Sequence, residues 1–180
     1  FLLELLVYPF KNEIGYFKDY KEQKKKNQNH VIESVREFSK PKYKVDIFKL
    51  ESPVDSSQLQ NSKFNKATED AFKQLSRATR NIPWVMLSSG MSKKSFLNCL
   101  KLAYKNGASG YLAGRTIWLD AFKDYPNYKK ITTKLSNESA RYVKKLNELT
   151  NKNAQSLEKY LTEKLIQKNS SNFKNIYKGF

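Results

Sequence analysis

The chain has 180 residues, with 34 lysines and arginines against 17 aspartates and glutamates, and therefore a formal net charge of +17. Hydrophobic residues make up 39% of the chain, enough for a packed core and too many for a typical disordered chain. A single cysteine, Cys99, excludes a disulfide framework and fits a reducing compartment. The longest apolar runs fall far short of the roughly 20 residues of a membrane-spanning helix. We therefore expect a cytoplasmic globular protein with no membrane partner.

The positive charge comes almost entirely from lysine, since only five basic residues are arginines. Arginine makes the bidentate contacts of specific base and phosphate recognition, so its scarcity argues against specific nucleic-acid binding. We interpret the lysines as a solvated surface that can attract anionic ligands. A non-enzymatic basic protein that binds nucleic acid is the alternative, and it would show a steep salt dependence of binding.

The first residue is Phe1, and the apolar run over residues 2–8 already indicates the middle of a structural element. Natural termini usually begin with a few polar, frayed residues. We therefore expect that the beginning of the protein is missing from this sequence.

Four short apolar runs alternate with amphipathic helical patterns along the chain. The runs, which we predict to be strands, cover residues 2–8, 45–50, 84–87 and 109–113. A polar loop is expected over residues 11–29. The predicted helices lie around residues 31–38, at 64–79, from an N-cap at Ser92 to a stop at Gly107, through 117–122 to near Pro126, and at 136–168, before a loose tail.

This alternation predicts an α/β fold, because strands that are apolar on both faces and separated by helices form a parallel sheet covered by helices. Four βα units are half of an eightfold (β/α)8 TIM barrel, which takes about 250 residues. A doubly wound sheet is the alternative. However, no glycine-rich phosphate loop follows the first strand, where that fold usually has one.

Two ionisable residues lie inside predicted strands. Lys49 shares one strand face with Val45 and Ile47, and Glu4 is flanked by leucines. Burial disfavours a charged amine and so supplies the neutral amine that imine formation needs, whereas a carboxylate beside it can transfer protons. A lysine whose ammonium reaches water and a structural ion pair are the simpler explanations. Adjacent parallel strands would bring Glu4 and Lys49 together.

Small residues follow the third and fourth predicted strands, as Ser88-Ser89-Gly90 and Gly114-Arg115. They expose backbone N–H groups at the start of a helix, and Arg115 adds a cation, which together are the features of a phosphate site. In eightfold barrels the loops after strands seven and eight often bind phosphate. Ordinary strand-to-helix turns, which also favour glycine and serine, are the alternative.

The only histidine, His30, lies beside the polar loop. A single histidine excludes a metal site with several histidine ligands, and no carboxylate cluster has the spacing of metal ligands. We expect neither a metal nor another cofactor.

Four sequence blocks together resemble the Schiff-base type of bacterial tagatose-1,6-bisphosphate aldolase. They are VIESVREFSK at 31–40, VDIFKLESPV at 45–54, WVMLSSG at 84–90 and GASGYLAGRTIW at 107–118. The resemblance runs from Phe1 to about Phe122 and covers the C-terminal half of that family's barrel. It implies strands five to eight in a half-barrel domain over 1–125, with a helical extension over 126–180.

The resemblance also implies a role for particular residues. Lys49 matches the sixth-strand lysine that forms the imine, and Glu4 matches the fifth-strand glutamate that shuttles protons. Ser88 matches a serine that contacts the substrate phosphate. Leu112, Gly114 and Arg115 match the L-x-G-R turn that binds phosphate.

The activity implied is metal-free cleavage of tagatose 1,6-bisphosphate to dihydroxyacetone phosphate and glyceraldehyde 3-phosphate. Two of the blocks also resemble the related sulfofructose-phosphate aldolase, so that substrate remains an alternative. The partner expected is a phosphorylated sugar and not a nucleic acid, and the sequence leaves a homo-oligomer open. The polar loop and the region beyond Phe122 resemble the family only loosely.

Overall fold

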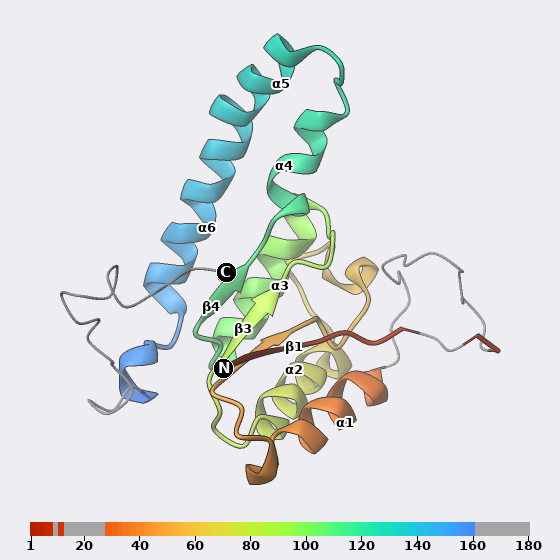
Figure 1. Ribbon diagram of the computed structural model, residues 1–180, viewed down its shortest axis with the longest axis vertical. Coiled ribbons are helices and arrows are strands. Elements are labelled where there is room, and N and C mark those ends of the chain that lie inside the picture. The colour runs from red at the N-terminus through yellow and green to blue at the C-terminus, as the bar shows by residue number, and fades with distance from the viewer. Residues whose placement is uncertain (9–10, 13–27, 161–180) are drawn as a thin grey trace, which may run out of the picture.

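The computed structural model describes residues 1–8, 11–12 and 28–160, in which four parallel strands form one sheet in the order β1-β2-β3-β4 (Figure 1). The strands are β1 (Leu2–Leu5), β2 (Ile47–Leu50), β3 (Trp84–Leu87) and β4 (Gly110–Leu112). The principal helices are α1 (Gln28–Phe38), α2 (Lys66–Ala78), α3 (Lys93–Lys105), α4 (Arg115–Phe122), α5 (Tyr128–Lys134) and α6 (Ala140–Asn153). Short 3-10 turns lie at Pro41–Tyr43, Ser56–Leu59 and Leu157–Tyr160. The predicted α/β alternation is confirmed, as four βα units that match part of a TIM barrel. The predicted first strand is shorter than expected, and most of the predicted polar loop, residues 13–27, lies outside the described residues.

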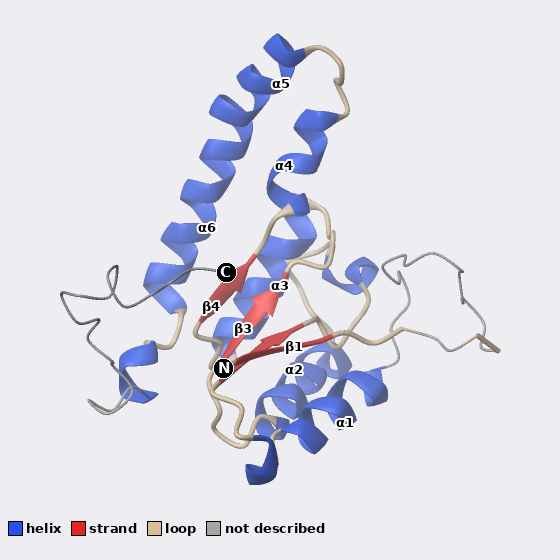
Figure 2. Cartoon of the chain, in the orientation of Figure 1, coloured by secondary structure: helices blue, strands red, loops and turns tan. Residues whose placement is uncertain are grey.

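The two faces of the sheet have different surroundings. Leu5, Leu50 and Met86 are in register on neighbouring strands, and Leu50 and Met86 are buried in the core. Figure 2 shows the strands in front of α2 and α3, which lie behind the sheet. On the opposite face, Leu2 and Leu112 are 46% and 42% exposed. In the described part of the chain this second face is therefore open, and we call it the open face.

The core lies between the sheet and helices α1 to α3. Its fully buried side chains come from every layer, as expected when amphipathic helices cover a parallel sheet. Among the largest are Phe48, Phe72, Phe96, Leu75 and Leu100.

Helix α3 begins and ends at the predicted residues. The Ser92 side chain accepts a hydrogen bond from Ser95 N at 3.1 Å, which satisfies one of the unpaired N–H groups of the first turn. At the other end Gly107 adopts a φ of 88°, which a side chain would strain, and so it ends the helix. The Ser92 cap therefore fixes where α3 leaves the carboxyl edge of the sheet, and Gly107 ends the helix shortly before β4 begins.

The predicted single helix over 136–168 is wrong in its bounds. Helical structure begins at Tyr128, passes through one π-helical turn at Leu135–Ser139 and ends at Asn153. Ala154 is extended, and Gln155 N donates to Ala108 O at 3.0 Å, so a contact with the body of the fold turns the chain away. Residues 161–168 lie outside the description.

Helix α6 is held against α3 at both ends. Tyr142 Oη donates to Lys93 O at 2.9 Å, and the hydroxyls of Tyr104 and Thr150 lie 2.7 Å apart. Between them Leu146 is fully buried. Burial raises the pKa of Tyr104 to about 12, so this hydroxyl keeps its proton at neutral pH. Across the described residues, no helix has both the length and the apolar character that a membrane span requires.

Candidate active site

Glu4 on β1 and Lys49 on β2 lie side by side on the open face. Parallel pairing puts the two residues directly opposite each other, and Lys49 Nζ donates to Glu4 Oε2 at 2.8 Å. On the other side of Lys49, the register partner is Val85 of β3, which is buried. The lysine therefore has a carboxylate on one flank and an aliphatic side chain on the other. The predicted juxtaposition of Glu4 and Lys49 is confirmed.

Both side chains are accessible, which fits the simpler explanation of a lysine that reaches water within an ion pair. The Lys49 side chain is 21% exposed and the Glu4 side chain 38% exposed. Their neighbours along the strands are apolar, but the open face has no second layer over it among the described residues. The carboxylate and the ammonium therefore form an accessible ion pair at the surface of the sheet.

A second carboxylate near Lys49 holds the end of β1 in place. Glu51 follows Lys49 by two positions and is only 2% exposed. Its Oε1 accepts a hydrogen bond from Val7 N at 2.7 Å, two residues beyond the last residue of β1. Sequence analysis found no carboxylate cluster with the spacing of metal ligands and did not single out Glu51. The sequence signal that could have identified Glu51 is a charged residue directly after a predicted strand, two positions from Lys49.

The loops after β3 and β4 are linked directly to each other. Ser88 N donates to Leu112 O at 3.3 Å, and Thr116 Oγ1 donates to Met91 O at 2.9 Å. Ser88 is buried, whereas Arg115 is exposed at the first turn of α4, directly after Gly114. The four residues predicted from the sequence thus lie in or directly beside two adjoining loops at the carboxyl edge of the sheet.

The loop after β3 has an unusual backbone conformation. Ser89 and Gly90 have φ values of 45° and 65°, in the left-handed region that L side chains rarely adopt. The Ser89 hydroxyl is buried and has no hydrogen-bond partner among the described residues. A buried polar group of this kind requires an explanation, and a bound ligand is one. Sequence analysis included Ser89 in the cluster but did not select it.

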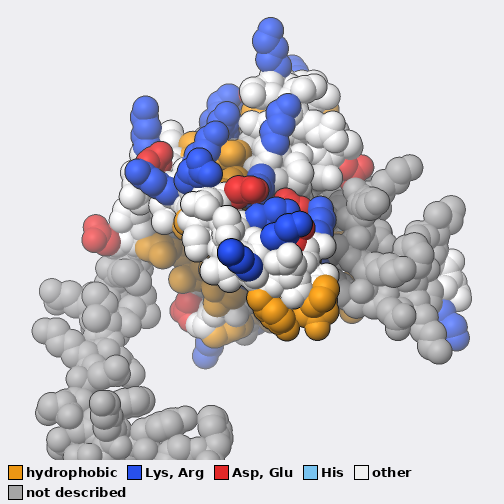
Figure 3. Space-filling view, turned by 90° about the horizontal axis from the view of Figure 1, so that it is seen from above, with side chains coloured by type: hydrophobic (Ala, Val, Ile, Leu, Met, Phe, Trp, Pro, Cys, Tyr) orange, Lys and Arg blue, Asp and Glu red, His pale blue; other side chains and the backbone are white. Residues whose placement is uncertain are grey.

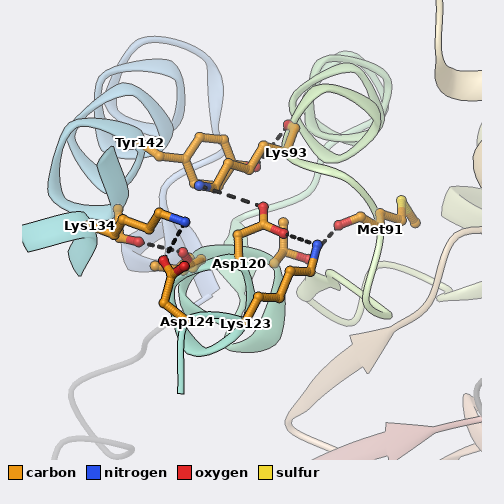
Figure 4. A network of polar contacts seen from close by, with 10 residues as sticks. Met91, Lys93, Asp120, Lys123, Asp124, Lys134 and Tyr142 are labelled. Atoms are coloured by element: carbon orange, nitrogen blue, oxygen red, sulfur yellow. Dashed lines mark hydrogen bonds and ion pairs between the residues drawn. The ribbon is translucent and has the colours of Figure 1, made fainter. Parts of the chain in front are cut away.

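A network of polar contacts joins these loops to the C-terminal helices (Figure 4). Asp120 of α4 lies 2.7 Å from Lys123 Nζ and 3.9 Å from Lys93 Nζ of α3. The hydrogen bond from Lys123 lowers the pKa of the Asp120 carboxyl. Lys93 and Lys123 are therefore partly neutralised beside the loops.

Lys49 and the two loops lie at different heights along the strands of the sheet. Ser88 is three residues past Val85, the register partner of Lys49. At about 3.3 Å per residue, the loop begins about 10 Å farther towards the carboxyl edge. A ligand that contacts both Lys49 Nζ and the loop after β3 would have to span part of this distance. No three His, Cys, Asp or Glu side chains of the described residues come together as metal ligands would.

Residues 12–120 match the family model described as DeoC/LacD family aldolase. The chain belongs to this family. Three similar relatives are named tagatose 1,6-diphosphate aldolase. The Enterococcus faecalis protein with this name, numbered 1, is 34% identical over 126 residues, which cover 67% of this chain and 38% of the relative. The Lactococcus lactis protein is 32% identical over 133 residues, and the Streptococcus pneumoniae serotype 4 protein is 29% identical over 132 residues. Both alignments cover 69% of this chain and 40% of the relative.

This DeoC/LacD chain therefore spans about two fifths of the length of the curated relatives that it matches. The matched residues include β2, β3 and β4 and the loops after them, with Lys49, Ser88 and Arg115. They end at Asp120, so α5 and α6 lie outside the family model. The match thus covers the strands β2 to β4 of the open face, whereas β1 with Glu4 and the helices α5 and α6 lie outside it.

Proposed function

We propose that this protein is an aldolase that uses Lys49 as a Schiff-base lysine to cleave a ketose bisphosphate. The observation that carries the proposal is the hydrogen bond between Lys49 Nζ and Glu4 Oε2 on the open face of the sheet. Imine formation needs a neutral amine and a group that transfers protons to and from the ketone oxygen. Glu4 Oε2 accepts a hydrogen bond from Lys49 Nζ and is therefore placed to exchange protons with it.

In the proposed reaction Glu4 takes a proton from the Lys49 ammonium, and the neutral amine attacks the C2 ketone. Glu4 returns this proton to the oxygen that leaves as water. The iminium then accepts the electron pair of the C3–C4 bond as Glu4 takes the proton of the C4 hydroxyl, which becomes an aldehyde. Glu4 gives this proton to C3 of the enamine that remains, and water releases dihydroxyacetone phosphate from Lys49. The aldehyde product is glyceraldehyde 3-phosphate when the substrate is tagatose 1,6-bisphosphate.

The two loops at the carboxyl edge would hold a substrate phosphate. Backbone N–H groups after β3, the Ser88 and Ser89 hydroxyls and the Arg115 guanidinium supply donors and positive charge. The Leu112 carbonyl keeps the two loops together through Ser88 N. Binding of the phosphate there fixes the ketone carbon near Lys49, so the binding free energy contributes to orientation.

Lys49→Arg tests this function, because arginine keeps the charge but does not present a neutral amine. We expect the variant to lose cleavage of tagatose 1,6-bisphosphate, measured by a coupled assay for glyceraldehyde 3-phosphate. Lys66→Arg, at an exposed lysine of α2, is the matched control and should keep full activity. Chelator treatment should leave the wild-type rate unchanged. Normal turnover by Lys49→Arg would refute the mechanism, whereas preference for sulfofructose phosphate would change only the substrate.

A further inference from the structure

A groove between α3 and α6 collects lysines from both helices. Lys94 and Lys101 come from α3, and Lys145 and Lys152 come from α6. These four residues, with Leu97 and Leu149 between them, define what we call the lysine groove. The groove has a volume of about 410 Å³, and one acidic residue, Glu148, is among the described residues that line it. On the face seen in Figure 3, basic side chains outnumber acidic ones.

The two helices run in the same direction, so the lysines form two pairs. The contact of Tyr142 with Lys93 joins the first turns of the helices, and that of Tyr104 with Thr150 joins later turns. On each helix the two groove lysines are seven positions apart, which corresponds to about 10 Å along the axis. Lys94 and Lys145 therefore lie near one end of the groove, and Lys101 and Lys152 near the other.

The lining of the groove is ordered by contacts with the core. Asn98 is 3% exposed, and its Nδ2 donates to Leu59 O at 2.9 Å. Its Oδ1 accepts a hydrogen bond from Lys101 Nζ at 3.4 Å, which directs this lysine along the lining. Half-buried Leu97 and Leu149 make the floor apolar. A second hollow of about 280 Å³ shares Lys101, Leu149 and Asn153 and extends the groove.

We infer that the lysine groove binds a compact small molecule that carries two or more phosphoryl groups. Four like charges around one hollow repel each other, and an anion between them removes that repulsion. Lysine binds phosphate as a point charge with three donors, whereas no arginine lines the groove to recognise one planar group. The volume is within the range of small-molecule sites. A groove about two helical turns long is too short for the extended basic surface that a nucleic acid needs.

This site is separate from the proposed active site. One wall is α6, which lies beyond residues 12–120 of the family match. The other wall is the face of α3 turned away from the sheet. The inference goes beyond the proposed aldolase function and holds or fails independently of it.

Calorimetric titration of the full chain with inositol hexakisphosphate tests the inference. We expect one molecule to bind per chain, more weakly as salt rises. Lys101→Gln with Lys145→Gln should weaken binding by about tenfold or more. The control, Lys129→Gln with Lys130→Gln, removes the same charge from exposed positions on α5 and should change the affinity by less than about twofold. Arg115→Gln should also leave the affinity for inositol hexakisphosphate unchanged.

Equal weakening by the two double variants would overturn the inference, because overall charge would then explain binding. Loss of binding in Arg115→Gln would overturn it by placing the ligand at the sheet edge. The inference would also be overturned if a 20-nucleotide single-stranded RNA bound more tightly than inositol hexakisphosphate and both double variants weakened its binding equally. Thermal unfolding of each variant without ligand checks that a lost signal is not lost folding.

Discussion

Removal of the Glu51 carboxylate should loosen the sheet at the point where β1 ends. Glu51 is 2% exposed, and its Oε1 lies 2.7 Å from Val7 N. A hydrogen bond to a charged group contributes about 1.5–3 kcal/mol, and a buried donor left unpaired costs about 1–3 kcal/mol. Val7 is only half-buried, so water can partly replace the lost acceptor. We therefore expect Glu51→Ala to lower the free energy of unfolding by about 2 kcal/mol and Glu51→Gln, which keeps a neutral acceptor, by about 1 kcal/mol.

Urea denaturation followed by tryptophan fluorescence measures these differences. Glu148→Ala replaces an exposed glutamate of α6 and should stay within about 0.5 kcal/mol of the wild type. Because Glu51 orients the strand that carries Glu4, we also expect kcat to fall in the order wild type, Glu51→Gln, Glu51→Ala. The reasoning is refuted if Glu51→Ala is as stable as Glu148→Ala.

Three further changes test other parts of the structure. Hydrogen bonds from Lys40 and Tyr43 lower the pKa of Glu37 from 4.5 to about 2. The ionised Glu37 therefore stabilises the fold above about pH 4.5, and this contribution is lost as the pH falls towards 2. Glu37→Gln should flatten the acid side of the stability profile in that window, and an unchanged profile would contradict the assignment. Leu146→Ala should cost about 2–5 kcal/mol in calorimetric unfolding, because the side chain is fully buried; a loss below about 1 kcal/mol would mean that α6 is not packed on α3. Gly90→Ala should raise KM for the sugar phosphate, because a φ of 65° strains any residue with a side chain by about 1–2 kcal/mol. An unchanged KM would show that this turn does not bind the phosphate.

The order of strands and helices could be predicted from the sequence because each element carries its own signal. Period and length distinguish the apolar strands from the amphipathic helices, and Ser92 and Gly107 mark the ends of α3 through local backbone chemistry. These signals depend on neighbours within a few positions. The end of α6 depends on a distant group, the Ala108 carbonyl that accepts from Gln155 N, and so the apolar stripe predicted a helix that is too long.

The candidate site was predictable to a similar extent. A lysine and a glutamate in successive parallel strands had to be close, and the register places them opposite each other. Their exposure could not be predicted from alternation, because alternation shows which residues share a face but not what covers that face. The contact of Glu51 with Val7 likewise depends on how two strands end, 44 positions apart in the sequence.

The most direct test of the central claim is reduction with borohydride in the presence of dihydroxyacetone phosphate. If Lys49 forms the imine, reduction makes a stable secondary amine, and peptide mass mapping should find the adduct on the peptide that contains Lys49. Lys49→Arg should give no adduct, and omission of the ketone should give none in the wild type. An adduct on any other lysine, or full aldolase activity without a trappable adduct, would contradict the account.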